Sequence, residues 1–326
     1  MKTFLKLIVS PVIIALTISC GGGGGGDSVA TTNTTSSTST DEFYIVNYEE
    51  STLNSPSISS EFTSSFSQES ASFKGLVDSS KVLQGEAKAN ELETSPKFRL
   101  ALKTGTITGS VSGVYHVVVY GLVNASSRVV VGQYTIDFSQ NPVVVTNASS
   151  ILNTYAQALN SAGTLTSTIS VTEKGRVTYG NWSGAISADL NTMLLTNTVD
   201  GKMFLLATKQ SSFTSSVIEG SNTVISVSQY KDDNSQTTIA SSGGTATYEN
   251  GTNNASASVV HTSTDNKVSI PSGSRTFGLN SSDTSVIELK NGNGDVTELG
   301  FISSDNYFVN INPDNPDRPL LSIIFK

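Results

Sequence analysis

Short runs of alternating apolar and polar residues recur along most of this chain, and they constrain its fold more than any other feature. In Gly132–Phe138, every second residue from Tyr134 onward is apolar and the residues between are polar. Tyr115–Tyr120 is a run of aromatic and β-branched residues, which suits a central strand. The pattern predicts an all-β protein made mainly of antiparallel sandwich or barrel units. Further strands are expected at Val143–Val145, Thr164–Val171, Arg176–Tyr179, Met203–Ala207, Val224–Tyr230, Thr245–Tyr248, Ala257–His261, Ser285–Leu289, Val296–Ile302, Tyr307–Ile311 and Leu320–Phe325.

One or two short helices interrupt the expected strands. In Ser149–Ser161, the residues Ile151, Leu152, Tyr155 and Leu159 form one apolar stripe at helical spacing. Lys81–Leu92 is a second segment that a helix would accommodate.

The N-terminus has the pattern of an export signal. Lys2 and Lys6 precede the mostly apolar stretch Leu7–Ile18, which is too short to span a bilayer and has the length of a signal-peptide core. The stretch ends at Ser19-Cys20, and Cys20 is the only cysteine of the chain. This segment resembles the lipobox signal peptide of bacterial lipoproteins, although Thr17 stands where leucine is more usual. The resemblance covers residues 1–20 alone, and it implies cleavage before Cys20 followed by lipidation, with palmitate among the acyl chains, on that residue.

The residues after Cys20 predict a flexible tether. Gly21–Gly26 is a run of six glycines, and Asp27–Thr40 is almost free of apolar residues. Such a segment buries too little surface to offset the entropy of ordering, and about 20 residues of it would reach roughly 25 Å. Bacterial lipoproteins with glycine after the lipidated cysteine usually go to the outer membrane, so the resemblance implies an outer-membrane lipoprotein that faces either the periplasm or the cell surface.

These observations divide the chain into five segments. The body is expected to hold two β-units, which a shared order of Arg, Thr, aromatic, Gly and Asn in Arg176–Asn181 and Arg275–Asn280 suggests are related. The alternative is one elongated β-structure without symmetry. The segments are a signal peptide (1–19), a lipid-anchored tether (20–41), an N-terminal lead-in (42–100), a first β-unit with the helix 149–161 (101–210) and a second β-unit (211–326).

Charge and cysteine content exclude several classes of function. The net charge is −8, and cleavage before Cys20 removes two of the 19 basic residues and none of the 27 acidic ones, which leaves about −10. A negative chain of this kind is not expected to bind nucleic acid. With one cysteine, the chain forms no internal disulfide and no thiolate metal cluster.

Catalytic motifs are missing from the sequence. Gly109–Gly113 has the glycines of a nucleophile elbow but Val111 at its centre, and no phosphate loop, dinucleotide fingerprint or zinc-protease motif is found. His116 and His261 both lie in β-patterned runs, where each is more typical of a strand residue than of a base. We therefore expect no enzymatic activity, no catalytic residue and no cofactor, and a hydrolase centred on one of the histidines is the least favoured alternative.

Two features are weak candidates for binding. Asn291, Asn293 and Asp295 alternate oxygen ligands with glycine and could wrap a calcium ion, but an Asn-Gly hairpin turn explains them better. Trp182 lies beside a glycine in an expected turn and would suggest a sugar or partner contact if exposed, whereas a position at the edge of the core is the simpler interpretation.

The sequence favours a membrane-anchored binding or adhesion protein. Its lipidated N-terminus would hold it to the membrane, and its β-body would bind an unknown protein or glycan. The first alternative is a β-barrel carrier of a small apolar ligand or lipid. The second alternative is a structural component of the cell envelope.

Overall fold

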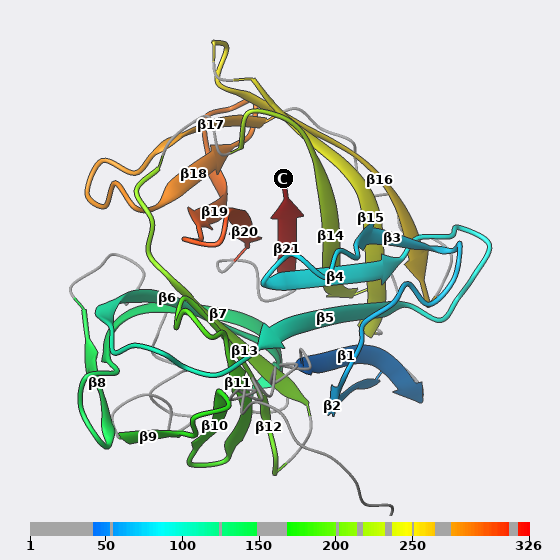
Figure 1. The fold of residues 1–326 in the computed structure, drawn as a ribbon. Helices are drawn as coiled ribbons and strands as arrows, with labels where there is room; N and C mark the ends of the chain where they lie inside the picture. Colours follow the sequence, from blue (N-terminus) through cyan, green and yellow to red (C-terminus); the bar gives the residue numbers. More distant parts are fainter. Residues whose placement is uncertain are drawn as a thin grey trace, which may run out of the picture. The chain divides into compact units, whose positions relative to one another are not determined.

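The alternating runs form two closed barrels and one open sheet (Figure 1). The computed structural model describes residues 42–52, 55–123, 126–148, 168–199, 202–213, 218–231, 237–249, 251–264, 275–312 and 319–326. The regular elements in these ranges are 21 strands, so the all-β prediction is confirmed. Cys20, the tether and the expected helix 149–161 lie outside the described residues. In the described part of the chain, no helix has the length and apolar character needed to cross a membrane.

The N-terminal part of the body is an antiparallel five-stranded sheet in the order β2-β1-β5-β4-β3. It occupies most of the expected lead-in segment 42–100, and its last paired strand continues to Thr104. The strands are β1 (Glu42–Thr52), β2 (Ser55–Thr63), β3 (Phe73–Leu76), β4 (Leu83–Lys88) and β5 (Lys97–Thr104).

The helix expected over Lys81–Leu92 is wrong, because Leu83–Lys88 is the strand β4. The segment contains good helix formers, but β3 and β5 pair with it on both sides. The charge of Glu86 is compensated across the strands by Arg99, which donates a hydrogen bond to its carboxylate. Tertiary pairing therefore overrides the intrinsic helix propensity of this segment.

The first barrel has eight antiparallel strands and closes through the pairing of β13 with β6. Its strands are β6 (Ser112–Val123), β7 (Ser126–Asp137), β8 (Val143–Asn147), β9 (Thr168–Val171), β10 (Arg176–Tyr179), β11 (Trp182–Ile186), β12 (Thr192–Asn197) and β13 (Met203–Lys209).

The second barrel also has eight antiparallel strands and closes through the pairing of β14 with β21. Its strands are β14 (Gly220–Lys231), β15 (Thr237–Glu249), β16 (Asn254–Ser263), β17 (Arg275–Leu279), β18 (Ile287–Lys290), β19 (Val296–Ile302), β20 (Tyr307–Ile311) and β21 (Leu320–Phe325).

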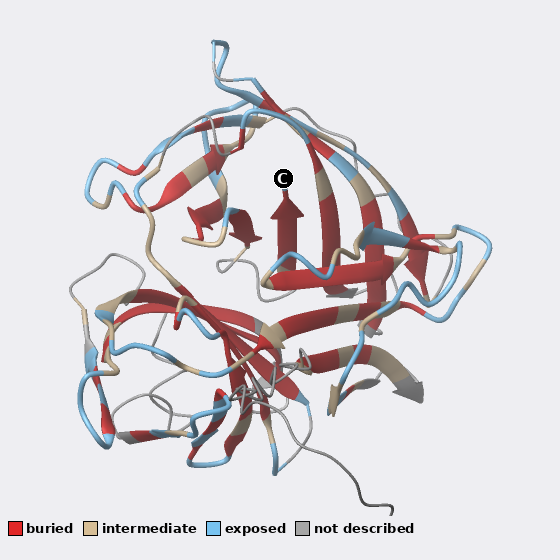
Figure 2. Cartoon of the chain, in the orientation of Figure 1, coloured by how far each residue is buried: buried red, intermediate tan, exposed pale blue. Residues whose placement is uncertain are grey.

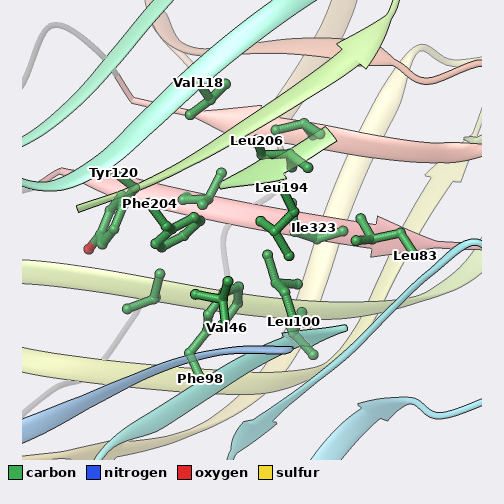
Figure 3. Packing of buried hydrophobic residues seen from close by; sticks show 14 of the residues in the cluster. Val46, Leu83, Phe98, Leu100, Val118, Tyr120, Leu194, Phe204, Leu206 and Ile323 are labelled. Atoms are coloured by element: carbon green, nitrogen blue, oxygen red, sulfur yellow. The ribbon is translucent and has the colours of Figure 1, made fainter. Parts of the chain in front are cut away.

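A shared core joins the sheet to the outer walls of both barrels. Leu100 of the sheet, Leu206 of the first barrel and Ile323 of the second belong to one buried cluster, and Figure 3 shows them pointing into it. The colouring by burial in Figure 2 marks β4 and β21 as buried along nearly their whole lengths. In β21 both alternating sets contain apolar residues, as is typical of a strand with two buried faces, whereas one of the two sets of β4 is polar. The barrels therefore have apolar side chains outside as well as inside. An apolar side chain alone does not show which face of a strand points into the barrel.

Candidate functional site

Large side chains of the described residues pack together in the interior of the first barrel. All eight of its strands contribute alternate residues to one buried cluster, which identifies these residues as the inward-facing set. Four large aromatic residues of this cluster are each at most 3% exposed: Tyr115, Tyr134, Tyr179 and Trp182. The Tyr115 hydroxyl donates a hydrogen bond to the carbonyl of Leu190 at 2.6 Å. In the described part of this barrel, these side chains form an apolar core.

The interior of the second barrel differs, because its inward-facing positions change from apolar to polar along the strands. Val224, Phe308 and Ile324 belong to an apolar cluster to which all eight strands contribute. Two residues further along β14 and β20, the same inward face carries Ser226 and Asn310. In β21 the corresponding residue is Ser322, which the strand pairing sets directly beside both of them: Ser226↔Ser322 and Asn310↔Ser322.

These polar positions line a cavity of about 290 Å³ inside the second barrel. Its size is close to the lower limit of typical small-molecule sites. The lining combines small apolar residues with polar and charged ones. Apolar lining comes from Val224, Ala246, Ala255, Ala257, Val259, Leu289, Leu320 and Ile324, and polar lining from Ser226, Ser228, Tyr248, Ser256, Arg275, Thr297, Glu298, Asn310, Asn312 and Ser322.

Glu298 and Asn310 form the polar centre of the cavity. The Nδ2 group of Asn310 donates a hydrogen bond to the Glu298 carboxylate, which sets the orientation of the amide. The Oδ1 atom of Asn310 is buried and accepts no hydrogen bond from the described residues, and the residue as a whole is 5% exposed. Beside them, the hydroxyls of Ser226 and Ser322 are hydrogen-bonded to each other at 2.8 Å.

Aromatic rings close the apolar end of the interior. The ring of Tyr248 contacts those of Phe277 and Phe308 edge-on, with centroids 5.7 Å and 5.9 Å away. Burial and the nearby charge of Glu298 raise the pKa of the Tyr248 hydroxyl well above its ordinary value. Tyr248 is therefore a neutral hydrogen-bonding group at physiological pH.

The polar groups that line the cavity can form hydrogen bonds, and neither His116 nor His261 belongs to that lining. His116 lies between the barrels, where its Nε2 atom is 3.2 Å from the Ser285 hydroxyl. That hydroxyl donates to Asp283 at 2.5 Å, whereas the serine of a Ser-His-Asp triad donates to the histidine. His261 is hydrogen-bonded through Nδ1 to Ser242 at 3.2 Å.

The sequence-based candidates do not come together at this cavity. Trp182 begins strand β11 and is 3% exposed, so its ring packs inside the first barrel and is not presented to a sugar or partner. Asn291, Asn293 and Asp295 form the turn between β18 and β19. In that turn, the Oδ1 atom of Asn291 accepts hydrogen bonds from the backbone nitrogens of Asn293 at 2.9 Å and Asp295 at 3.0 Å. These bonds are those of a hairpin turn.

The residues that line the cavity were not among the sequence-based candidates. The available signal was the polar residue that interrupts each of two apolar strands, Asn310 in Tyr307–Ile311 and Ser322 in Leu320–Phe325. Buried polar residues in such strands indicate either an internal hydrogen-bond network or a ligand.

Comparisons with known proteins provide no family for the chain. No protein-family model matches it, and no curated protein matches it. Among solved structures, part of the chain matches transferrin binding protein B from Haemophilus parasuis, a vaccine antigen crystallised as a double mutant. The two are 9% identical, the match covers 74% of this chain and 50% of that one, and the TM-score is 0.28. The chain thus spans about half the length of that protein.

Proposed function

We propose that the chain is a membrane-anchored binding protein that holds a small molecule inside its second barrel. The observation that carries the proposal is the contrast between two eight-stranded barrels of one chain. The described inward-facing residues of the first barrel form an apolar cluster that includes Tyr and Trp side chains, whereas the second barrel has a cavity of about 290 Å³ lined by Glu298 and Asn310.

Physical cost supports this interpretation. A cavity forgoes the packing contacts that stabilise a core, and a buried polar atom without a hydrogen bond costs about 1–3 kcal/mol. Asn310 Oδ1 is such an atom among the described residues. A bound molecule that fills the cavity and donates a hydrogen bond to Asn310 would remove both costs. The sequence-based alternative was a carrier of an apolar ligand or lipid. The mixed lining favours a ligand with polar groups instead, because a purely apolar ligand would leave Asn310 Oδ1 without a hydrogen bond.

A ligand screen by thermal unfolding tests the proposal. A molecule present at about 100 times its dissociation constant stabilises the folded state by about 2.7 kcal/mol, which corresponds to roughly 5 °C for a chain of this size. The shift should disappear in Ala257→Leu, because Ala257 lines the cavity. It should persist in Ser258→Leu, a matched control that adds the same side chain at the neighbouring, exposed position of β16.

Two results would count against binding in the barrel. One is a library without any stabilising compound, and the other is a compound whose effect is the same in Ala257→Leu as in the unaltered protein. The second result would favour the other function expected from the sequence, in which an outer surface binds a protein or glycan.

The proposed location is the outer membrane, with anchoring through lipidated Cys20. Support comes from the lipobox-like residues before Cys20 and from the polar, glycine-rich segment that follows it. Protease treatment of intact cells, with lysed cells as the control, distinguishes the two possible sides of the membrane. Loss of the body from intact cells indicates the cell surface, and survival until lysis indicates the periplasm.

A further inference from the structure

We infer that the ligand of the second barrel is an uncharged, polyhydroxylated molecule about the size of a monosaccharide, whose hydroxyl groups donate hydrogen bonds to Asn310 and Glu298. This inference rests on the proposed function and adds the chemical class of the ligand.

The polar centre of the cavity offers hydrogen-bond acceptors to a ligand. Because the Asn310 amide nitrogen donates to the Glu298 carboxylate, the amide oxygen is turned away from it and has to meet a donor. No described residue supplies that donor, although the side chain is buried. Glu298 is an acceptor as well when ionised. The ligand therefore has to bring O–H or N–H groups to this part of the cavity.

The two charged residues that line the cavity favour a neutral ligand. Arg275 and Glu298 both line the cavity, and their formal charges cancel. The remaining polar lining consists of hydroxyls and amides, among them Ser226, Ser322 and Asn312. A cationic amine would meet the guanidinium of Arg275, and an anion would meet the carboxylate of Glu298. A neutral ligand encounters neither repulsion, so hydroxyl groups are favoured over ammonium groups as the donors.

The apolar part of the lining favours a ligand that also has C–H groups. The neighbouring strands β15 and β16 line the cavity with three alanines, Ala246, Ala255 and Ala257, and the pairing sets Ala246 opposite Ala257. Their small side chains leave a smooth apolar wall beside the polar centre. A sugar ring combines donor groups at its rim with C–H groups on its faces, so it matches both parts of the lining. A fatty chain matches the wall alone.

The test is a binding measurement with defined probes on the full mature chain. Neutral hexoses, N-acetylhexosamines and linear polyols form the first panel, and 1-hexanol, hexanoate and hexylamine form the second. Ligand-observed NMR and calorimetry report the affinities. We expect at least one member of the first panel to bind and to be excluded by Ala257→Leu. In Asn310→Leu, which removes the acceptor at similar volume, its affinity should fall by about tenfold or more while that of 1-hexanol is unchanged or higher.

Misfolding would lower both affinities, so a loss of affinity for the polyol alone is not produced by it. If Asn310→Leu does not fold, Ser322→Ala provides the same comparison with a smaller loss. Binding of 1-hexanol, hexanoate or hexylamine in preference to every polyol, with exclusion by Ala257→Leu, would overturn the ligand class and leave the proposed function intact. If neither panel binds and Ala257→Leu behaves as the unaltered protein does, the proposed function itself is wrong.

Discussion

Acidification should destabilise the protein through His116, a buried residue that connects the two barrels. Its Nε2 atom lies 3.2 Å from the Ser285 hydroxyl of the second barrel and 3.2 Å from the side-chain nitrogen of Gln133 in the first. Its ring stacks on Phe301 with a centroid distance of 4.6 Å. Burial lowers the pKa of His116 from 6.5 to about 4, and the charge of Asp283 opposes this shift only in part.

The sign and size of the effect follow from the difference in pKa between the folded and unfolded chains. Because the folded pKa is the lower one, the contribution of neutral His116 to stability is complete above about pH 6.5 and is lost as the pH falls toward about 4. With 1.36 kcal/mol per pKa unit, the full loss is about 3 kcal/mol, of which about 2 kcal/mol is lost by about pH 5.

A second buried group acts in the opposite direction. Burial raises the pKa of Asp305 to about 6, although hydrogen bonds from Thr192 and Asn191 lower it in part. Since this folded pKa is above the ordinary one, the contribution of Asp305 is complete below about pH 4 and is lost as the pH rises through about 6. Between about pH 8 and pH 5, Asp305 therefore offsets about 1 kcal/mol of the loss from His116. The effect of His116 has to be measured as a difference between two proteins.

The assay is urea unfolding of the unaltered protein and of His116→Gln at about pH 8 and about pH 5. The stability difference between them should change by about 2 kcal/mol in favour of the glutamine variant on acidification. His261→Gln, which replaces the other histidine, is the control and should keep the His116-dependent change. An equal difference at both pH values, or an NMR titration of His116 near its ordinary pKa, would show that burial of neutral His116 does not contribute to this pH dependence.

Three further changes test other parts of the structure. A methyl group at Gly300 would lie 2.1 Å from the ring of Phe308, so Gly300→Ala should destabilise the protein by about 1–3 kcal/mol, and a double-mutant cycle with Phe308→Leu should show coupling of about 1 kcal/mol or more in urea unfolding. Asp305→Asn should raise the free energy of unfolding at about pH 8 relative to about pH 5 by about 1 kcal/mol, and denaturation at both pH values would detect a missing or reversed change. Cys20→Ser should abolish palmitate incorporation and move the protein from the membrane fraction to the soluble fraction, and an unchanged membrane fraction would argue against the lipid anchor.

The strands of the barrels were predictable where apolar alternation and turn residues coincide. The predicted ranges Arg176–Tyr179 and Val296–Ile302 are the observed strands β10 and β19. The strand over Leu83–Lys88 was not predictable, because the burial of Glu86 depends on Arg99, which only the folded sheet brings beside it. Trp182 was expected in a turn, but pairing with β10 and β12 extends the sheet through it.

The cavity could not be predicted, because alternation does not show which face of a strand points into a barrel when both faces are buried. In β20, the outward-facing Val309 and Ile311 pack in the core shared with the sheet and the first barrel, whereas the inward set includes Asn310. From sequence, the apolar set of such a strand is naturally assigned to the interior. At the polar end of the second barrel the opposite holds: the apolar residues face outward and the polar residue faces inward. This orientation follows from closure of the barrel, which depends on the pairing of β14 with the distant strand β21.

Native mass spectrometry of the mature protein, purified without denaturation from its own membrane, detects whether the second barrel holds a ligand. We expect a non-covalently bound small molecule that is released on unfolding. It should be present in the unaltered protein and in Ser258→Leu and absent from Ala257→Leu. A protein that carries no such mass and gains none on incubation with the neutral sugar and hexyl probe panels would contradict a ligand-binding second barrel.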